Sequence, residues 1–219
     1  RQAAGLTRQN WKSAVFIVLL FVGIYIVRTV VSMAGQGVSD GSGMQYVKEW
    51  AAMFKNPMMW LNIAALPINY FFVFIAFFGE EYGWRYYLQP VLQKRFGLRA
   101  GVIILGVVWG LWHIPDDLFY YTQTSGIQMI FAQQITCISL GIFFAYAYMK
   151  TQNIWVPVCL HYLNNNLIPI ISGTFSADVL ENQTVSWKDL PVALVLNGLC
   201  FGFFLLADVF KKKEVQEEE

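Results

Sequence analysis

The segment Asn69–Pro90, NYFFVFIAFFGEEYGWRYYLQP, is the most informative part of the chain because it joins a lipid-like run to charged residues. Residues Asn69–Phe78 carry no charge, yet Glu80, Glu81 and Arg85 follow closely after them. A charged side chain within hydrocarbon is costly unless it faces the protein interior and has a partner, and such residues are usually functional. The segment therefore predicts a membrane-embedded helix that carries a polar site.

The composition indicates an all-α, polytopic integral membrane protein with an intramembrane polar cavity. Of 219 residues, 57% are hydrophobic and only 13% are charged, whereas soluble domains have about 25% charged residues. Apolar segments of about 20 residues are long enough to cross a bilayer as helices. We predict six spans in a single membrane-embedded domain over residues 1–219: Lys12–Ser32, Met58–Gly79, Ala100–His113, Ile127–Met149, Ile154–Ser172 and Leu190–Phe210.

The positions of lysine and arginine predict the orientation, because cytoplasmic loops carry an excess of both. Basic residues gather before the first span, after the second, after the fourth and after the sixth: Arg1, Arg8, Lys12, Arg85, Lys94, Arg95, Arg99, Lys150 and Lys211–Lys213. Both termini are therefore expected in the cytoplasm of a multi-pass cell-membrane protein. The net charge of +1 argues against a nucleic-acid partner.

Polar residues also occur inside two further spans. His113 ends the third span, and His161 lies in the fifth. At a rise of about 1.5 Å per residue, Glu80, His113 and His161 each lie about 16–21 Å from the basic residues that mark the cytoplasmic surface. Three helices thus place a carboxylate and two histidines at similar depth. This agreement predicts one composite site, although a single intramembrane histidine is often only a satisfied interhelical contact.

The spacing within the second helix separates its two carboxylates. Glu81 and Arg85 are four residues apart and can pair on one helix face. Glu80 is rotated by about 100° from its neighbour and points elsewhere. An Arg–Glu pair of this kind is most often a structural clamp. We expect Arg85 to hold Glu81 ionised, which leaves Glu80 to take a proton from water.

The histidines suggest the remaining roles. His113 can hold the water that Glu80 activates. His161 and Asn165 are also four residues apart, so both can donate hydrogen bonds to a developing oxyanion. The candidate site residues are therefore Glu80, Glu81, Arg85, His113, His161 and Asn165.

Three short motifs resemble those of a known family. EEYGWR at Glu80–Arg85 fits E-E-x-x-x-R, WGLWH at Trp109–His113 fits aromatic-x-x-x-H, and HYLNN at His161–Asn165 fits H-x-x-x-N. In this order, the chain resembles the CAAX-protease and bacteriocin-processing family of intramembrane endopeptidases, which includes the type II CAAX prenyl endopeptidase. The resemblance covers residues 71–171. Trp109 departs from the usual phenylalanine, which affects packing rather than chemistry.

The resemblance implies a helical fold with a cavity open to the cytosol, and hydrolysis of a peptide bond. It also implies that Glu80 is the water-activating base, Glu81 and Arg85 its supports, His113 the second water ligand, and His161 with Asn165 the oxyanion stabilisers. Members are often called metalloproteases, and Glu80, His113 and His161 would make a His₂Glu zinc set. The sequence lacks H-E-x-x-H, and a water held between glutamate and histidine needs no metal, so both mechanisms stay open.

The sequence also leads to expectations about the substrate, the partners and the alternative functions. The short chain suggests a bacterial protein, for which leader peptides, signalling peptides or membrane-protein tails are better candidates than prenylated tails. The lipid bilayer and a membrane protein partner are further expected contacts. The alternative is a non-enzymatic bacteriocin-immunity factor, or a membrane partner of another enzyme, on the same scaffold. A transporter with a proton relay is a third class, but the sequence shows no repeat symmetry.

Overall fold

The computed structural model describes residues 6, 10–36, 41–174 and 176–211, and every regular element within these ranges is helical. The all-α prediction is therefore confirmed. The elements are α1 (Trp11–Gln36), α2 (Gly43–Met53), α3 (Pro57–Glu81), η1 (Tyr82–Leu88), α4 (Gln89–Phe96), α5 (Leu98–Trp112), α6 (Ile114–Phe119), α7 (Gly126–Thr151), α8 (Trp155–Ser172), α9 (Ala177–Glu181), α10 (Asp189–Cys200), η2 (Gly202–Leu206) and η3 (Asp208–Phe210).

The number of clear membrane spans is smaller than predicted. In the described part of the chain, four helical segments are long and apolar enough to cross a membrane: Trp11–Gly35, Pro57–Phe96, Leu98–Phe119 and Gly126–Thr151. They confirm a polytopic membrane protein. The predicted fifth span is α8, whose 18 residues include a histidine and three asparagines that lower its hydropathy. The predicted sixth span is a 12-residue α10 that continues as 3₁₀ segments.

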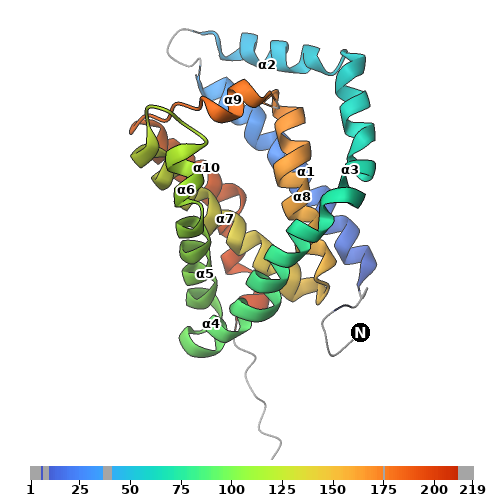
Figure 1. Ribbon diagram of the computed structural model, residues 1–219, viewed down its shortest axis with the longest axis vertical. Helices are drawn as coiled ribbons and strands as arrows, with labels where there is room; N and C mark the ends of the chain where they lie inside the picture. The colour runs from blue at the N-terminus through green and yellow to red at the C-terminus, as the bar shows by residue number, and fades with distance from the viewer. Residues whose placement is uncertain (1–5, 7–9, 37–40, 175, 212–219) are drawn as a thin grey trace, which may run out of the picture.

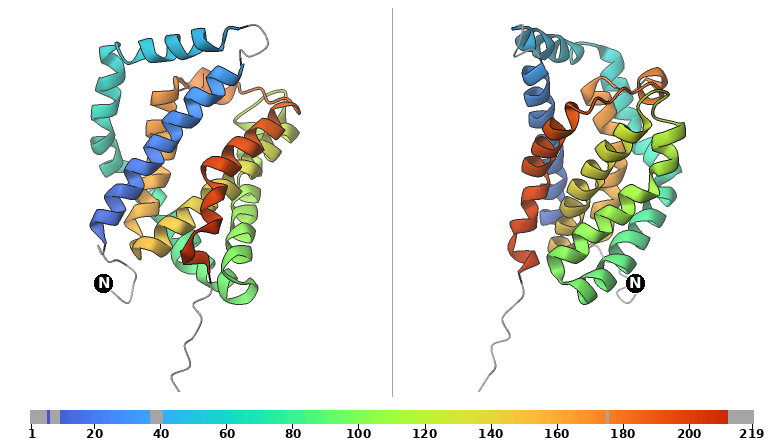
Figure 2. Two further views of the ribbon diagram at one scale, coloured as in Figure 1. Left: turned by 180° about the vertical axis from the view of Figure 1, so that it is seen from behind. Right: turned by 90° about the vertical axis from the view of Figure 1, so that its left-hand side faces the viewer.

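Several helix ends that carry basic residues lie at the same end of the molecule. The start of α1, α4, the end of α7 and η3 lie together, whereas α2, α6 and α9 lie at the opposite end (Figures 1 and 2). Lys94 and Arg95 occupy the last turn of α4, and Lys150 occupies the last turn of α7. This arrangement agrees with the sequence prediction that these basic segments lie on the same side of the membrane. The placement of that end in the cytoplasm stays a prediction.

The long second span is a bent rod made of α3, η1 and α4. Pro67 lies inside α3, where its missing N–H removes a helical hydrogen bond, and α3 bends along its length (Figure 1). Phe71 and Phe72 expose 72% and 75% of their surface, as expected of side chains that face lipid. The rod continues past Arg85 and ends at Phe96, beyond the predicted span Met58–Gly79.

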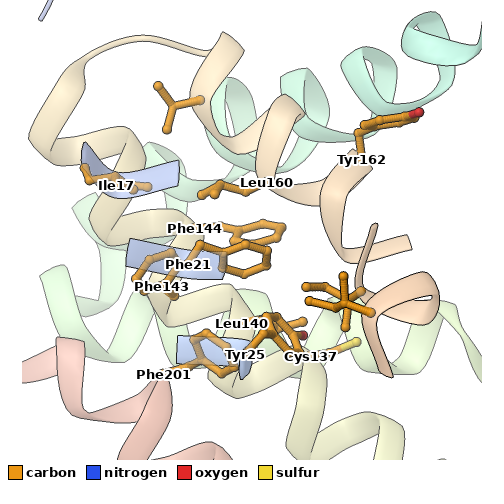
Figure 3. Close-up of a cluster of buried hydrophobic side chains, with 14 of the residues drawn as sticks. Ile17, Phe21, Tyr25, Cys137, Leu140, Phe143, Phe144, Leu160, Tyr162 and Phe201 are labelled. Atoms are coloured by element: carbon orange, nitrogen blue, oxygen red, sulfur yellow. The ribbon is translucent and has the colours of Figure 1, made fainter. Parts of the chain in front are cut away.

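The packed core is built around α7 and is rich in aromatic side chains. Phe143 and Phe144 of α7 are fully buried, as are Phe21 of α1 and Phe201 beyond α10 (Figure 3). The rings of Phe21 and Phe143 stack at 5.6 Å, and Phe201 lies 5.6 Å from Phe143. Offset and edge-to-face contacts of this kind add to the stabilisation from burial itself. Helix α7 therefore holds the neighbouring helices in fixed positions around the polar residues described below.

Close approach of α5 and α7 requires glycine at Gly106. A Cβ atom at this position would lie 2.6 Å from the Cα atom of Ile138, which is too close for backbone that cannot move. Gly141 of α7 faces the same contact, since its Cβ would lie 3.4 Å from the Cα atom of Gly106. Small residues let membrane helices approach closely, so this contact fixes the distance between α5 and α7.

Replacing Gly106 with alanine should therefore destabilise the protein by about 1–3 kcal/mol, the usual cost of overpacking. Gly23→Ala is the matched control, because no atom lies within 4 Å of a Cβ at Gly23 of α1. Alanine favours helix over glycine by roughly 0.5–1 kcal/mol, so the control should be neutral or stabilising. Thermal unfolding of both variants in one detergent makes the comparison. Equal midpoints would contradict the close packing of α5 on α7.

Candidate active site

Glu81 and Arg85 form a buried ion pair at the end of α3. Arg85 Nε donates to Glu81 Oε2 at 2.9 Å, and both side chains are completely buried. Arg85 Nη1 also donates to the carbonyl oxygen of Gly141 at 3.2 Å, which ties the pair to α7. Arg85 lies in the π-helical turn η1, and single π-helical turns occur frequently at functional sites. The predicted pairing of these two residues is confirmed.

His161 of α8 joins this pair through the other carboxylate oxygen. Its Nδ1 donates to Glu81 Oε1 at 2.9 Å, and the His161 side chain is only 4% exposed. Glu81 thus accepts from two helices, with one oxygen for each donor. The sequence predicted that polar residues of α3 and α8 would meet, because they lie at similar depth in the membrane. The sequence did not indicate which of the two adjacent carboxylates would contact His161.

Trp109 of α5 forms an aromatic wall beside these residues. The Arg85 guanidinium lies over the Trp109 ring at 5.2 Å from its centroid, and the His161 ring lies 5.5 Å away in an edge-to-face contact. Phe77 of α3 packs edge-to-face on His161 at 5.1 Å. These contacts exclude water from the buried charges and strengthen their electrostatic interaction. Trp109 therefore packs within the candidate site, although the sequence interpretation assigned it to general packing.

His113 at the end of α5 lies beside Cys137 of α7. His113 caps α5, and its Nδ1 donates to the carbonyl oxygen of Trp109 at 2.8 Å, which leaves Nε2 as an acceptor in the neutral imidazole. Cys137 Sγ lies 3.8 Å from His113 Nδ1. Glu80 and His113 are partly exposed, in contrast to Glu81 and Arg85.

Asn165 lies one turn beyond His161 and is exposed. Its Oδ1 accepts a hydrogen bond from Asn164 Nδ2 at 2.9 Å. The neighbouring Asn166 makes a contact between helices, because its Oδ1 accepts a hydrogen bond from Asn69 Nδ2 of α3 at 3.3 Å. The direct link between Asn164 and Asn165 was missed, since neighbours in a helix point in directions about 100° apart.

A metal site is not preformed. In the ranges that the structure describes, no three histidine, cysteine, aspartate or glutamate side chains are grouped as metal ligands. The His₂Glu zinc set of Glu80, His113 and His161 therefore stays a prediction from the family resemblance. Cys137, Cys159 and Cys200 are free.

Comparisons with known proteins show which family the chain resembles. A family model described as "Type II CAAX prenyl endopeptidase Rce1-like" matches residues 60–167, a range that contains all six candidate site residues. CAAX prenyl protease 2 of Methanococcus maripaludis is 27% identical over 125 residues, which cover 53% of this chain and 45% of the relative. The chain thus spans about half the length of the curated relative that it matches. No solved structure matches the chain.

Proposed function

Because of these similarities, we propose that the chain is a member of the CAAX protease family and an intramembrane endopeptidase in which Glu80 and His113 activate a water molecule. Proteases of this family act on membrane-associated peptides. The six candidate residues supply the groups that hydrolysis needs, which are a base, an orienting acceptor and oxyanion donors. The observation that carries the proposal is the buried network of Glu81, Arg85 and His161, which holds one of the donors in place.

The buried network argues for function because it is a poor way to stabilise a fold. Taking charges out of water costs free energy that their mutual attraction often fails to repay, and apolar residues of similar volume frequently do as well. Charged residues at membrane depth are usually retained for function. Here the network fixes the direction of the His161 ring, because Nδ1–H points at Glu81 and Nε2 lies on the opposite side of the ring.

Glu80 is the better base of the two neighbouring carboxylates. Both oxygens of Glu81 already accept hydrogen bonds from Arg85 and His161, so they have less capacity to take a proton from water. Glu80 is partly exposed, so water can reach it. A carboxylate that must accept a proton works best where it is not neutralised by a fixed cation.

The proposed reaction follows from these positions. Glu80 accepts one proton from the water while His113 Nε2 accepts a hydrogen bond from the other, so that the water oxygen lone pair faces the substrate carbonyl. The oxygen adds to the carbonyl carbon and the carbonyl oxygen becomes an oxyanion. The C–N bond then breaks, and the proton held by Glu80 passes to the leaving nitrogen. The products are a carboxylic acid, which keeps the second proton of the water, and an amine, with one water consumed; proton exchange then gives a carboxylate and an ammonium group.

His161 and Asn165 stabilise the oxyanion in this scheme. When His161 donates through both ring nitrogens it is an imidazolium, and the Glu81 carboxylate stabilises that charge. Asn165 contributes a neutral amide donor from the next turn of α8. A donor that is held in place before the reaction costs no reorganisation when charge develops, which is why such groups lower the barrier.

A direct assay separates this proposal from a non-enzymatic scaffold. Purified protein in lipid nanodiscs is mixed with a fluorogenic peptide that ends in a CAAX sequence, either farnesylated or unmodified, and with leader peptides. We expect multiple turnovers on at least one peptide, with or without a strong chelator, because the described side chains form no ready metal set. Tight binding of these peptides without cleavage would favour the alternative of an immunity factor or membrane partner.

A further inference from the structure

A chain of hydrogen bonds connects helix α1 to the candidate oxyanion donor. The hydroxyl of Tyr25 donates to Asn164 Oδ1, and Asn164 Nδ2 donates to Asn165 Oδ1 at 2.9 Å. Tyr25 is only 4% exposed and lies outside residues 60–167, the range that the family model matches. Tyr25 lies outside the motifs described above, and Asn164 occupies only an unspecified position of H-x-x-x-N.

The direction of these bonds has a chemical consequence. In an asparagine side chain the oxygen and the NH₂ group lie on opposite sides of one planar amide. A donor bound at Asn165 Oδ1 therefore turns the two N–H bonds of Asn165 away from Asn164. The Tyr25 hydroxyl does the same one step earlier, because it occupies Asn164 Oδ1 and directs Asn164 Nδ2 toward Asn165.

Asn165 needs this support because it is exposed. A surface side chain samples several rotamers, and fixing it has an entropic cost. An oxyanion donor acts efficiently only when it points at the reacting oxygen before charge develops. A buried tyrosine on another helix is a suitable anchor, since the Tyr25 ring is held by Phe21 at 4.9 Å and Phe201 at 5.1 Å.

We propose that Tyr25 is a positioning residue that orients the Asn165 amide through Asn164. This inference rests on the proposed function, because it assigns Tyr25 to the oxyanion donor of the same reaction. Tyr25 does not touch the reacting atoms. Its effect on catalysis passes through Asn165, and it should disappear when Asn165 is absent.

A second tyrosine provides a matched control. Tyr162 of α8 is 3% exposed, and its hydroxyl donates to the carbonyl oxygen of Leu66 at 2.7 Å. Tyr162→Phe therefore removes one buried hydroxyl and one interhelical hydrogen bond, as Tyr25→Phe does. Of the two hydroxyls, only that of Tyr25 bonds to the pair of Asn164 and Asn165, so a difference between the two variants isolates the positioning effect from general helix packing.

Steady-state kinetics supply the first measurement. Tyr25→Phe should lower kcat roughly tenfold with KM nearly unchanged, since a supporting hydrogen bond acts in the transition state. Tyr162→Phe should retain kcat. In an Asn165→Ala background, Tyr25→Phe should cause no further loss, because a residue that acts through Asn165 has nothing left to orient. Wild-type kcat in Tyr25→Phe, or an undiminished loss in the Asn165→Ala background, would overturn the proposal.

Side-chain amide spectra supply a measurement that does not depend on activity. In ¹⁵N-asparagine-labelled protein in detergent micelles, the Asn165 NH₂ signals are identified by their loss in Asn165→Ala. We expect Tyr25→Phe to shift these signals and Tyr162→Phe to leave them in place. Unshifted signals in Tyr25→Phe would overturn the positioning link. Shifted signals in a protein that cleaves no peptide would support the link while the proposed function fails.

Discussion

Replacing Glu80 with glutamine is expected to lower peptide cleavage by roughly 1,000-fold or more while the protein still inserts and folds. The glutamine side chain has nearly the same shape but cannot accept the proton of the attacking water, and general-base assistance contributes about 100- to 10,000-fold. Glu80 is partly exposed and lies outside the buried Glu81 network, so folding should be largely unaffected. Initial rates on the cleaved probe peptide, with thermal unfolding as the folding control, make this measurement.

Two further variants define what the Glu80 result means. Glu49→Gln changes an exposed carboxylate on α2 and should retain wild-type rates. Asn165→Ala should retain measurable activity, because loss of one oxyanion donor costs about 100- to 1,000-fold. Wild-type turnover in Glu80→Gln would overturn the assignment of the base and would direct attention to the neighbouring carboxylate.

Replacing Glu81 with alanine is expected to destabilise the protein by about 3–5 kcal/mol and to abolish cleavage. The change removes the acceptor of both Arg85 and His161, so a buried guanidinium loses its counter-charge. His161 also loses the bond that fixes its direction. Unfolding in a denaturing detergent reports the first effect, and the peptide assay reports the second. An unfolding midpoint equal to that of the wild type would contradict the buried network.

A double variant separates these two effects. Glu81→Leu combined with Arg85→Met removes both charges and supplies apolar side chains of similar volume, a change that is often neutral or stabilising for buried pairs. We expect it to recover much of the stability lost in Glu81→Ala and to stay inactive, since His161 still lacks its acceptor. Recovered activity would mean that Glu81 serves folding alone.

Several features of the fold and the site followed directly from the sequence. The spacing of Glu81 and Arg85 predicted their ion pair, because side chains four residues apart share a helix face even where the turn is locally π-helical. Equal depth predicted that α3 and α8 would bring polar residues together, as the bond between Glu81 and His161 shows. Depth depends only on rise per residue, which varies little between helices.

Other features depend on helix rotation and packing, which the sequence does not reveal. Whether Glu80 or Glu81 faces His161 depends on how α3 is turned about its axis, and the π-helical turn at Tyr82–Leu88 changes that rotation locally. The link from Tyr25 to Asn164 joins α1 to α8, and no periodic pattern connects helices that far apart in the chain. The sequence predicted more membrane spans than the described helices clearly show, in part because α8 is polar around His161 and Asn165.

The most direct test of the central claim is the fate of the water oxygen. In this experiment, the enzyme cleaves its peptide substrate once in H₂¹⁸O. Mass spectrometry is then used to analyse the product and the enzyme fragment that contains Glu80. If Glu80 activates water for direct attack, every new product carboxylate carries one ¹⁸O atom and Glu80 stays unlabelled. Unlabelled product together with ¹⁸O in Glu80 would show that the carboxylate itself attacks the peptide, and would contradict the account.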